Sequence, residues 1–312
     1  MRTDLEISEQ TSIIMISCFE LSLIGKFVSH SWRIFFDDQL SIVLTKLETI
    51  HEKLIRLNVV GRMKIKINWI SIVVIFLNVT EIVAYTVWII YHGHNYIIND
   101  MIIMWIANIC KSVVLFEYIL LILYTQWIVY KINDQIPERK SCLSTFRDMY
   151  LEVLECLNDV NKSIYGLPVI INCIAANTAD ILMNIYAHIL FPRDHENQRL
   201  FAFPLIGILV KTTNILTLYM IGHATEKEIN RMSLVLHQRS VVEKNPRIKR
   251  QIKIFLLRRV HEHFHFQLCG MYHINLKQLL ILLNSAIGYL LIQILFKFID
   301  LQCTLIRLLG LG

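Results

Sequence analysis

Residues 101–130 read MIIMWIANICKSVVLFEYILLILYTQWIVY, with only two charged side chains among them, Lys111 and Glu117. A helix rises 1.5 Å per residue, so this stretch is about 45 Å long as a helix. A hydrocarbon core of about 30 Å is crossed by roughly 20 apolar residues. The stretch is therefore predicted to be a membrane-spanning helix.

Other apolar stretches of similar length follow along the chain. Together with 101–130, the predicted spans are 13–27 (a weaker stretch that contains Glu20 and Lys26), 69–92, 165–190, 200–222 and 279–298. Of all residues, 55% are hydrophobic and 18% are charged, whereas about a quarter of a soluble domain is charged. We therefore expect an all-α, polytopic membrane helix bundle with about six transmembrane helices, built as a single domain over 1–312.

The basic residues indicate the orientation. Segments 28–68, 131–164 and 223–263 hold seven, five and ten Lys or Arg, whereas 93–100 holds none and 191–199 holds two. Cytoplasmic connections carry an excess of Lys and Arg, so the three basic linkers are expected in the cytosol and the C-terminus outside, in a multi-pass protein of the plasma membrane. An external C-terminus disfavours a G-protein-coupled receptor.

The basic linkers also show helical periodicity. Apolar residues alternate at steps of three and four, which marks one helix face. These stripes are Leu40, Val43, Leu47, Ile50, Leu54 and Leu57; then Leu143, Phe146, Tyr150, Val153, Leu157 and Val160; and a shorter run, Ile229, Met232 and Leu236. Two interpretations stay open: the helices cover one another below the membrane, or they form an oligomerisation domain.

Four ionisable residues, Glu81, Lys111, Asp180 and Lys211, fall near the middle of predicted spans. Exposing such groups to lipid costs several kcal/mol, so they are expected to face the bundle interior or a water-filled cavity. They are either structural ion pairs or the floor of an outward-opening ligand pocket. Side chains available to line such a pocket are Tyr85, Trp88, Trp105, Asn108, Asn184, His188 and Phe203; aromatic residues near span ends also serve as interfacial anchors.

A different class of function is suggested by His261-Glu262-His263-Phe264-His265. The pattern places two His at i and i+4 with Glu between them, as in zinc metalloproteases. A catalytic zinc needs a third protein ligand; His263 and His273 are candidates, whereas the only acid after Glu262 is Asp300, across the membrane. An intramembrane zinc protease using His261, Glu262 and His265 is therefore the alternative, and on the main interpretation neither a metal nor another cofactor is expected.

The last predicted span carries a family resemblance. Residues 266–280, FQLCGMYHINLKQLL, are followed by 286–294, AIGYLLIQI. These segments resemble the lead-in and last helix of the insect gustatory receptor family, whose signature is Thr-Tyr, five apolar residues and Gln-Phe. This chain keeps Gln293 and has Ala286, Ile287 and Ile294 at the other signature positions.

Three more segments resemble the same family in the expected order: 32–62, 146–165 and 224–240. The resemblance covers roughly 28–298. On its register the six predicted spans correspond to helices two to seven of the family, and the first helix of the family has no counterpart.

The resemblance implies a taste receptor that is a tastant-gated, non-selective cation channel subunit, not an enzyme. It implies a tetramer with itself or related subunits, small-molecule tastants and membrane lipid as partners, and no nucleic acid. It also implies that Gln293 lines the central pore with Ile294 as a hydrophobic gate, lined or backed by Tyr289 and Ile287. An insect odorant receptor-like channel subunit is the nearest alternative.

Overall fold

The computed structural model describes residues 39–58, 69–92, 98–137, 143–162, 168–190, 202–260, 264–268 and 272–308. Almost all of these residues are helical, which confirms the predicted all-α fold. The elements are α2 (Gln39–Arg56), α3 (Trp69–His92), α4 (Ile98–Gln135), α5 (Leu143–Lys162), α6 (Pro168–Leu190), α7 (Ala202–Val242), α8 (Pro246–Val260), β1 (Gln267–Leu268), β2 (Tyr272–His273) and α9 (Leu276–Leu308). The span predicted at 13–27 lies outside the described residues.

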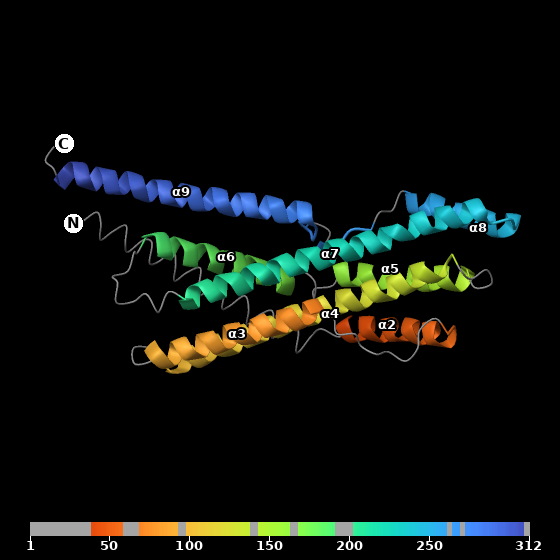
Figure 1. Ribbon diagram of the computed structural model, residues 1–312, viewed down its shortest axis with the longest axis horizontal. Coiled ribbons are helices and arrows are strands. Elements are labelled where there is room, and N and C mark those ends of the chain that lie inside the picture. Colours follow the sequence, from red (N-terminus) through yellow and green to blue (C-terminus); the bar gives the residue numbers. More distant parts are fainter. Residues whose placement is uncertain are drawn as a thin grey trace.

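The molecule is elongated, and two long helices connect its halves (Figure 1). Helices α4 and α7 run along its length and pack against each other. Helices α3, α6 and α9 lie beside them in one half, and α2, α5 and α8 lie beside them in the other. The two halves therefore share α4 and α7 as a continuous scaffold.

Three stretches in the described part of the chain are long and apolar enough to cross a membrane: Val113–Gln135, Leu205–Val242 and Leu276–Phe296. They overlap the spans predicted at 101–130, 200–222 and 279–298. The spans predicted at 69–92 and 165–190 fall on α3 and α6, and α3 contains a shorter apolar run, Ile72–Ala84. The chain is thus a membrane helix bundle.

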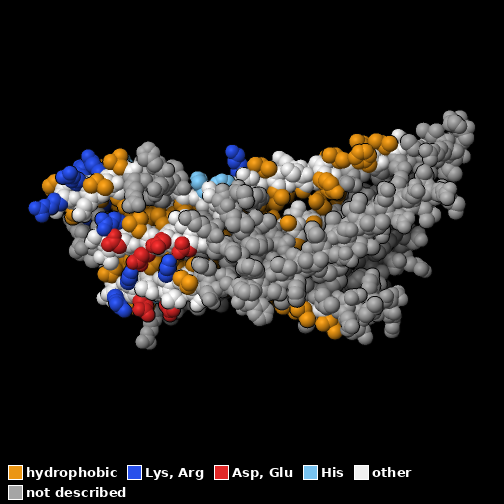
Figure 2. Space-filling model, turned by 180° about the vertical axis from the view of Figure 1, so that it is seen from behind, with side chains coloured by type: hydrophobic (Ala, Val, Ile, Leu, Met, Phe, Trp, Pro, Cys, Tyr) orange, Lys and Arg blue, Asp and Glu red, His pale blue; other side chains and the backbone are white. Residues whose placement is uncertain are grey.

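The two halves of the molecule differ in the charge of their surfaces. On the described surface, charged side chains gather at the end formed by α2, α5 and α8, and hydrophobic side chains follow the other end (Figure 2). Helix α7 has 41 residues, about 61 Å, which is twice the thickness of a hydrocarbon core. Its second half must therefore project from the membrane, together with the helices packed on it.

The described side chains of the predicted apolar stripes are buried inside this projecting half, apart from the half-buried Leu57, whereas the side chains of Leu40, Leu143 and Val160 lie outside the described residues. Val43, Leu47, Ile50 and Leu54 of α2 join the same core as the stripes of α5 and α7, which contribute Phe146, Tyr150, Val153, Leu157, Ile229, Met232 and Leu236. Ion pairs from Lys46 to Asp159 (3.0 Å) and from Lys53 to Glu152 (2.7 Å) flank the contact between α2 and α5. The helices thus cover one another within one chain, and these stripes do not require a second subunit.

A buried arginine joins the far ends of α4 and α7. Arg239 of α7 donates to the carbonyl oxygens of Ile136 (3.3 Å) and Pro137 (2.5 Å) just after α4, and pairs with Glu243 at 3.1 Å. The last carbonyls of a helix lack partners within the helix, and basic side chains can satisfy them. Arg239 therefore caps α4 from the neighbouring helix.

Candidate functional site

Three of the predicted mid-membrane charges meet between α3, α6 and α7. The Lys211 Nζ lies 2.9 Å from the Asp180 Oδ2 and 3.9 Å from the Glu81 Oε1. The Lys211 side chain is 13% exposed, so most of its surface is covered by the bundle. Opposite charges at one depth thus form an ion triad, which lowers the cost of placing each charge in a nonpolar setting.

A layer of amides lies one helical turn from this triad. Asn78 of α3 and Asn214 of α7 hydrogen-bond to each other in both directions, at 3.2 and 3.0 Å, and Asn78 also donates to the Val74 carbonyl at 2.7 Å. Sequence reasoning missed these residues. The available signal was their spacing, because Asn78 precedes Glu81 by three residues and Asn214 follows Lys211 by three.

Helix α6 repeats the same spacing with Asn177 and Asp180. Asn177 is 2% exposed, and its Oδ1 is buried without a hydrogen-bond partner. Residues three apart lie on the same helix face. Since Asp180 reaches Lys211, Asn177 lies on the face of α6 that meets this network.

The structure describes only one side chain, Asn184, among the other residues predicted to line the pocket. Asn184 lies one turn beyond Asp180 on α6 and is half-buried. The side chains of Tyr85, Trp88, Trp105, Asn108, Lys111, His188 and Phe203 lie outside the described residues, although their backbone belongs to α3, α4, α6 and α7. Of the residues predicted for the pocket, the structure therefore brings together Glu81, Asp180 and Lys211.

Helix α9 is covered on one side only. It packs against α6 and α7, and among the described side chains of Leu276–Phe296 only Leu279 is buried, whereas the others are exposed or half-buried. Of the predicted pore residues, Ile287 and Tyr289 are exposed, Ile294 is half-buried, and the Gln293 side chain lies outside the described residues. The open surface also includes Asn284 and Ser285, two polar residues that sequence reasoning did not single out.

The segment before α9 is anchored to α7. The Asn230 side chain donates to the Phe264 carbonyl at 3.0 Å and accepts from the Phe264 N–H at 3.1 Å. A Cβ on Gly222 would lie 2.9 Å from the Ile274 Cγ2 and 3.1 Å from the Ile274 carbonyl oxygen, so only glycine permits this approach. Asn275 then caps α9 by accepting from the Gln278 N–H at 2.9 Å.

Of the metalloprotease pattern the structure describes Phe264 and His265, whereas His261, Glu262 and His263 lie outside the described residues. Two His at i and i+4 share a face only on a helix, whereas α8 ends at Val260 and residues 264–266 are non-helical and lead into β1. The described contacts of His265 are with Glu226, whose Oε1 lies 2.8 Å from the His265 Nδ1, and with the His273 ring at 5.4 Å. In the described part of the chain, no group of His, Cys, Asp and Glu is arranged to hold a metal ion.

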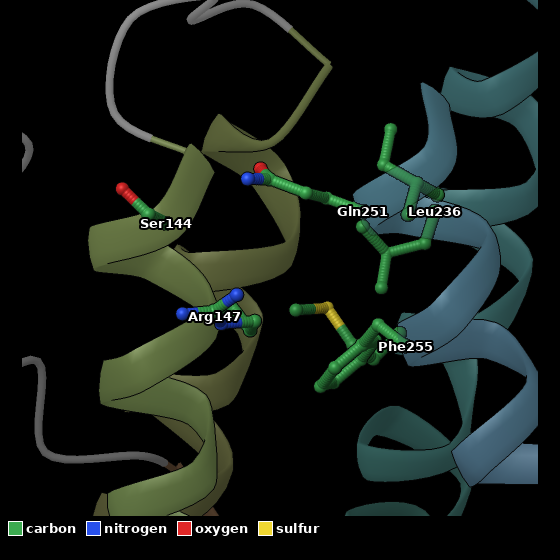
Figure 3. A pocket seen from close by; sticks show the side chains of 7 residues that line it. Ser144, Arg147, Leu236, Gln251 and Phe255 are labelled. Atoms are coloured by element: carbon green, nitrogen blue, oxygen red, sulfur yellow. The ribbon is translucent and has the colours of Figure 1, made fainter. Parts of the chain in front are cut away.

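A small cavity of about 20 Å³ opens in the projecting half, with room for about one water molecule. Its walls come from α5, α7 and α8 (Figure 3). The lining residues are Ser144, Arg147, Met232, Leu236, Gln251, Ile252 and Phe255. Its size makes it unsuitable for an organic ligand.

A known protein family matches most of the sequence. The sequence matches a family model described as 7tm Chemosensory receptor over residues 12–299. No curated protein matches the sequence significantly. The matched region contains α2 to α8 and most of α9, and so includes the ion triad, the amide layer and the anchored segment before α9.

Proposed function

The chain belongs to the 7tm chemosensory receptor family, and we propose that it is a gustatory receptor, a subunit of a tastant-gated, non-selective cation channel. The three basic linkers face the cytosol, and the C-terminus faces outward from the plasma membrane of a chemosensory neuron. On this proposal the half with α2, α5 and α8 is cytosolic.

The observation that carries the channel proposal is the open polar surface of α9. Asn284 lies about 12 Å along the helix from Leu276, within the apolar stretch Leu276–Phe296. Polar groups in a membrane seek hydrogen-bond partners on neighbouring helices or in water. In the described structure no other helix covers Asn284 and Ser285, and this supports a second copy or the water of a pore as their partner.

A symmetric assembly of several copies would supply both a neighbouring α9 helix and a water-filled pore. Four copies of α9 around an axis would enclose a pore, with Gln293 offering amide oxygens to partly dehydrated cations and Ile294 closing the passage by dewetting. Tyr289 and Ile287 line or back this region. The apolar stripes of α2 and α5 are not the contacts of this tetramer, because their own chain buries them.

The ligand site is proposed above the ion triad, on the outer side of the bundle. Glu81, Asp180 and Lys211 form its floor, and the aromatic and polar residues of the outer halves of α3, α4, α6 and α7 form its walls. A few polar groups among aromatic side chains are the usual composition of small-molecule sites.

Current recording tests the proposal. Cells that express the full chain, alone and with related subunits, are exposed to a panel of sugars, bitter alkaloids and amino acids. Tastant-evoked cation current supports the proposal. Its absence in every combination, with surface expression verified by an epitope at the C-terminus, would contradict it.

A further inference from the structure

The segment before α9, of which the structure describes residues 264–268 and 272–275, is held along one face of α7. Three residues of α7, each four positions from the next, make the contact: Gly222, Glu226 and Asn230. Residues four apart lie above one another on a helix face. Gly222 lies against Ile274. The Glu226 Oε1 lies 2.8 Å from the His265 Nδ1. The Asn230 side chain bonds both the N–H and the carbonyl of Phe264. The segment is therefore fixed to about two turns of α7.

The same segment is part of the buried core. Phe264, Phe266 and Ile274 are at most 6% exposed, and the Ile274 N–H donates to the Phe266 carbonyl at 2.9 Å. The rings of Phe264 and Phe266 meet edge to face, with their centroids 5.1 Å apart. In the described part of α9 that follows, the only buried side chain is Leu279. The direction of α9 therefore depends on how the segment before it is held.

Two side chains from α4 and α5 bond the backbone of α7 inside the same two turns. The Asn133 Nδ2 donates to the Glu228 carbonyl oxygen at 2.9 Å and to the Glu228 Oε1 at 3.0 Å. The Tyr150 hydroxyl donates to the Ile229 carbonyl oxygen at 2.8 Å. A carbonyl oxygen has two lone pairs, so it can accept such a bond in addition to its bond within the helix. Asn133 and Tyr150 are both buried, so the two contacts are shielded from water.

Three elements thus converge on residues 226–230 of α7. Glu228 and Ile229 hold α4 and α5, and Glu226 and Asn230 hold the segment before α9. Neighbouring residues of a helix point about 100° apart, which lets one short stretch serve three neighbours. A change in how α4 or α5 holds this stretch therefore reaches the segment before α9 across one or two residues of helix.

We propose that residues 226–230 of α7 form a joint that couples the projecting half to α9, with Asn133 and Tyr150 as positioning residues for α9. Both residues act through the α7 backbone, because their bonds end at Glu228 and Ile229, beside the residues that hold the segment before α9. The coupling of position stands independently of the channel function. Its consequence for gating rests on that function.

Hydrogen–deuterium exchange of the purified full chain in lipid nanodiscs tests the joint. Mass spectrometry measures the exchange rate of peptides that contain residues 264–275. Asn230→Ala removes both bonds to Phe264 and should accelerate exchange in these peptides about tenfold. Tyr150→Phe removes only a hydroxyl and keeps the ring, which preserves the packing of α5 on β1. It should accelerate exchange in the same peptides about threefold, because it loosens the joint from a different helix.

A matched control and a double variant separate this coupling from a general loss of stability. Tyr124→Phe also removes a tyrosine hydroxyl, which lies 3.1 Å from the His51 Nδ1, and should leave the exchange of residues 264–275 unchanged. Tyr150→Phe combined with Asn230→Ala should exchange no faster than Asn230→Ala alone, because the hydroxyl acts through the joint that Asn230→Ala opens.

Three results would overturn the coupling. They are unchanged exchange of residues 264–275 in Tyr150→Phe, equal acceleration in Tyr150→Phe and Tyr124→Phe, and a double variant whose two effects multiply. Tyr150→Phe is nearly isosteric with the wild type, so its comparison with Tyr124→Phe decides the matter even if Asn230→Ala does not fold.

Current recording tests the consequence for gating. Tyr150→Phe should shift the half-maximal tastant concentration about threefold, in line with its effect on exchange, whereas Tyr124→Phe should not shift it. Faster exchange in Tyr150→Phe with an unshifted response would overturn the role in gating. A wild-type chain that never conducts would contradict the proposed function, whereas the exchange rates would still decide whether the joint exists.

Discussion

The side-chain amides of Asn78 and Asn214 donate to each other reciprocally, which fixes α3 against α7 one turn from the ion triad. Both residues are buried. In a membrane bundle, where apolar burial gives little preference for one helix orientation over another, paired amides specify the register of two helices. The pair therefore holds Glu81 and Lys211 at the same level.

A double-mutant cycle should reveal this coupling. Asn78→Leu or Asn214→Leu alone leaves one buried amide without its partner and should lower the free energy of unfolding by about 1–2 kcal/mol. The double variant should cost less than the sum of the two, because no orphaned amide remains. Unfolding in detergent measures all four proteins, and strictly additive losses would contradict the reciprocal bond.

The network also shows where sequence reasoning works in this protein. Ionisable residues in an apolar stretch are rare and costly, so Glu81, Asp180 and Lys211 could be singled out without a structure. Asparagine is less unusual in such a stretch and did not stand out. The spacing of three residues to a charge acquires meaning only when three helices repeat it.

Periodicity predicted the helices of the projecting half, but it did not predict what covers them. A stripe such as Val43, Leu47 and Ile50 must be buried, yet the pattern is the same whether the cover is α5 of the same chain or another subunit. Contacts such as Gly222 with Ile274 join residues far apart in the sequence and have no local signature. Both depend on tertiary packing, which one sequence does not reveal.

Substitutions in the stripes should therefore report on folding. Leu47 is 1% exposed, and Leu47→Ala should cost about 2–5 kcal/mol of stability through the cavity it leaves. Leu47→Asp and Val153→Asp should unfold the projecting half by burying a carboxylate. Leu44→Ala, three residues earlier and 44% exposed, is the control and should change stability by less than about 0.5 kcal/mol. A smaller oligomer on native gels from a Leu47 variant of unchanged Tm would instead place the stripe between subunits.

Gly222→Ala should disturb the link between α7 and α9. The new Cβ would lie 2.9 Å from the Ile274 Cγ2 and 3.1 Å from its carbonyl oxygen, so the segment before α9 must shift. Overpacking of this kind costs about 1–3 kcal/mol, and the tastant response should weaken because α9 changes position. Gly207→Ala, where nothing lies within 4 Å, is the matched control and should be neutral or slightly stabilising. Equal Tm and equal currents in both variants would show that the close approach of Ile274 to α7 affects neither stability nor the tastant response.

Cys156 should be chemically inert in the folded chain. It is buried on α5, and burial raises the pKa of its thiol to about 11, although nearby Lys46 opposes the shift. Because the folded pKa exceeds the unfolded value, the stabilising contribution is complete below about pH 9 and is lost as pH rises through about 11. Iodoacetamide at pH 8 should therefore leave Cys156 unlabelled in the native protein and label it after unfolding, as measured by peptide mass spectrometry. Equal labelling before and after unfolding would contradict a buried thiol.

The pore prediction concerns Gln293, on the helix that the rest of the chain leaves most open. If four copies of α9 surround an axis, one substitution appears four times in a ring, so a small change per subunit is amplified. Gln293→Glu should favour divalent over monovalent cations. Gln293→Lys should reduce current by roughly tenfold or more, because a like-charged ring that raises the barrier by about 1.4 kcal/mol slows passage tenfold. Ile294→Ala should widen the hydrophobic constriction and raise the basal leak.

The competing possibility gives a different pattern. A Gln293 that faces lipid or packs on a neighbouring helix would make both charged variants fold or traffic poorly, with the ion preference unchanged in whatever channels reach the surface. Reversal potentials in bi-ionic solutions, normalised to surface expression, separate these cases. Leu280→Ala is a suitable control, because its exposed side chain lies more than three helical turns from Gln293 on the same helix. Because only the pore position requires charge to alter selectivity, unchanged reversal potentials in Gln293→Glu, Gln293→Lys and Ile294→Ala would remove Gln293 from the conduction path.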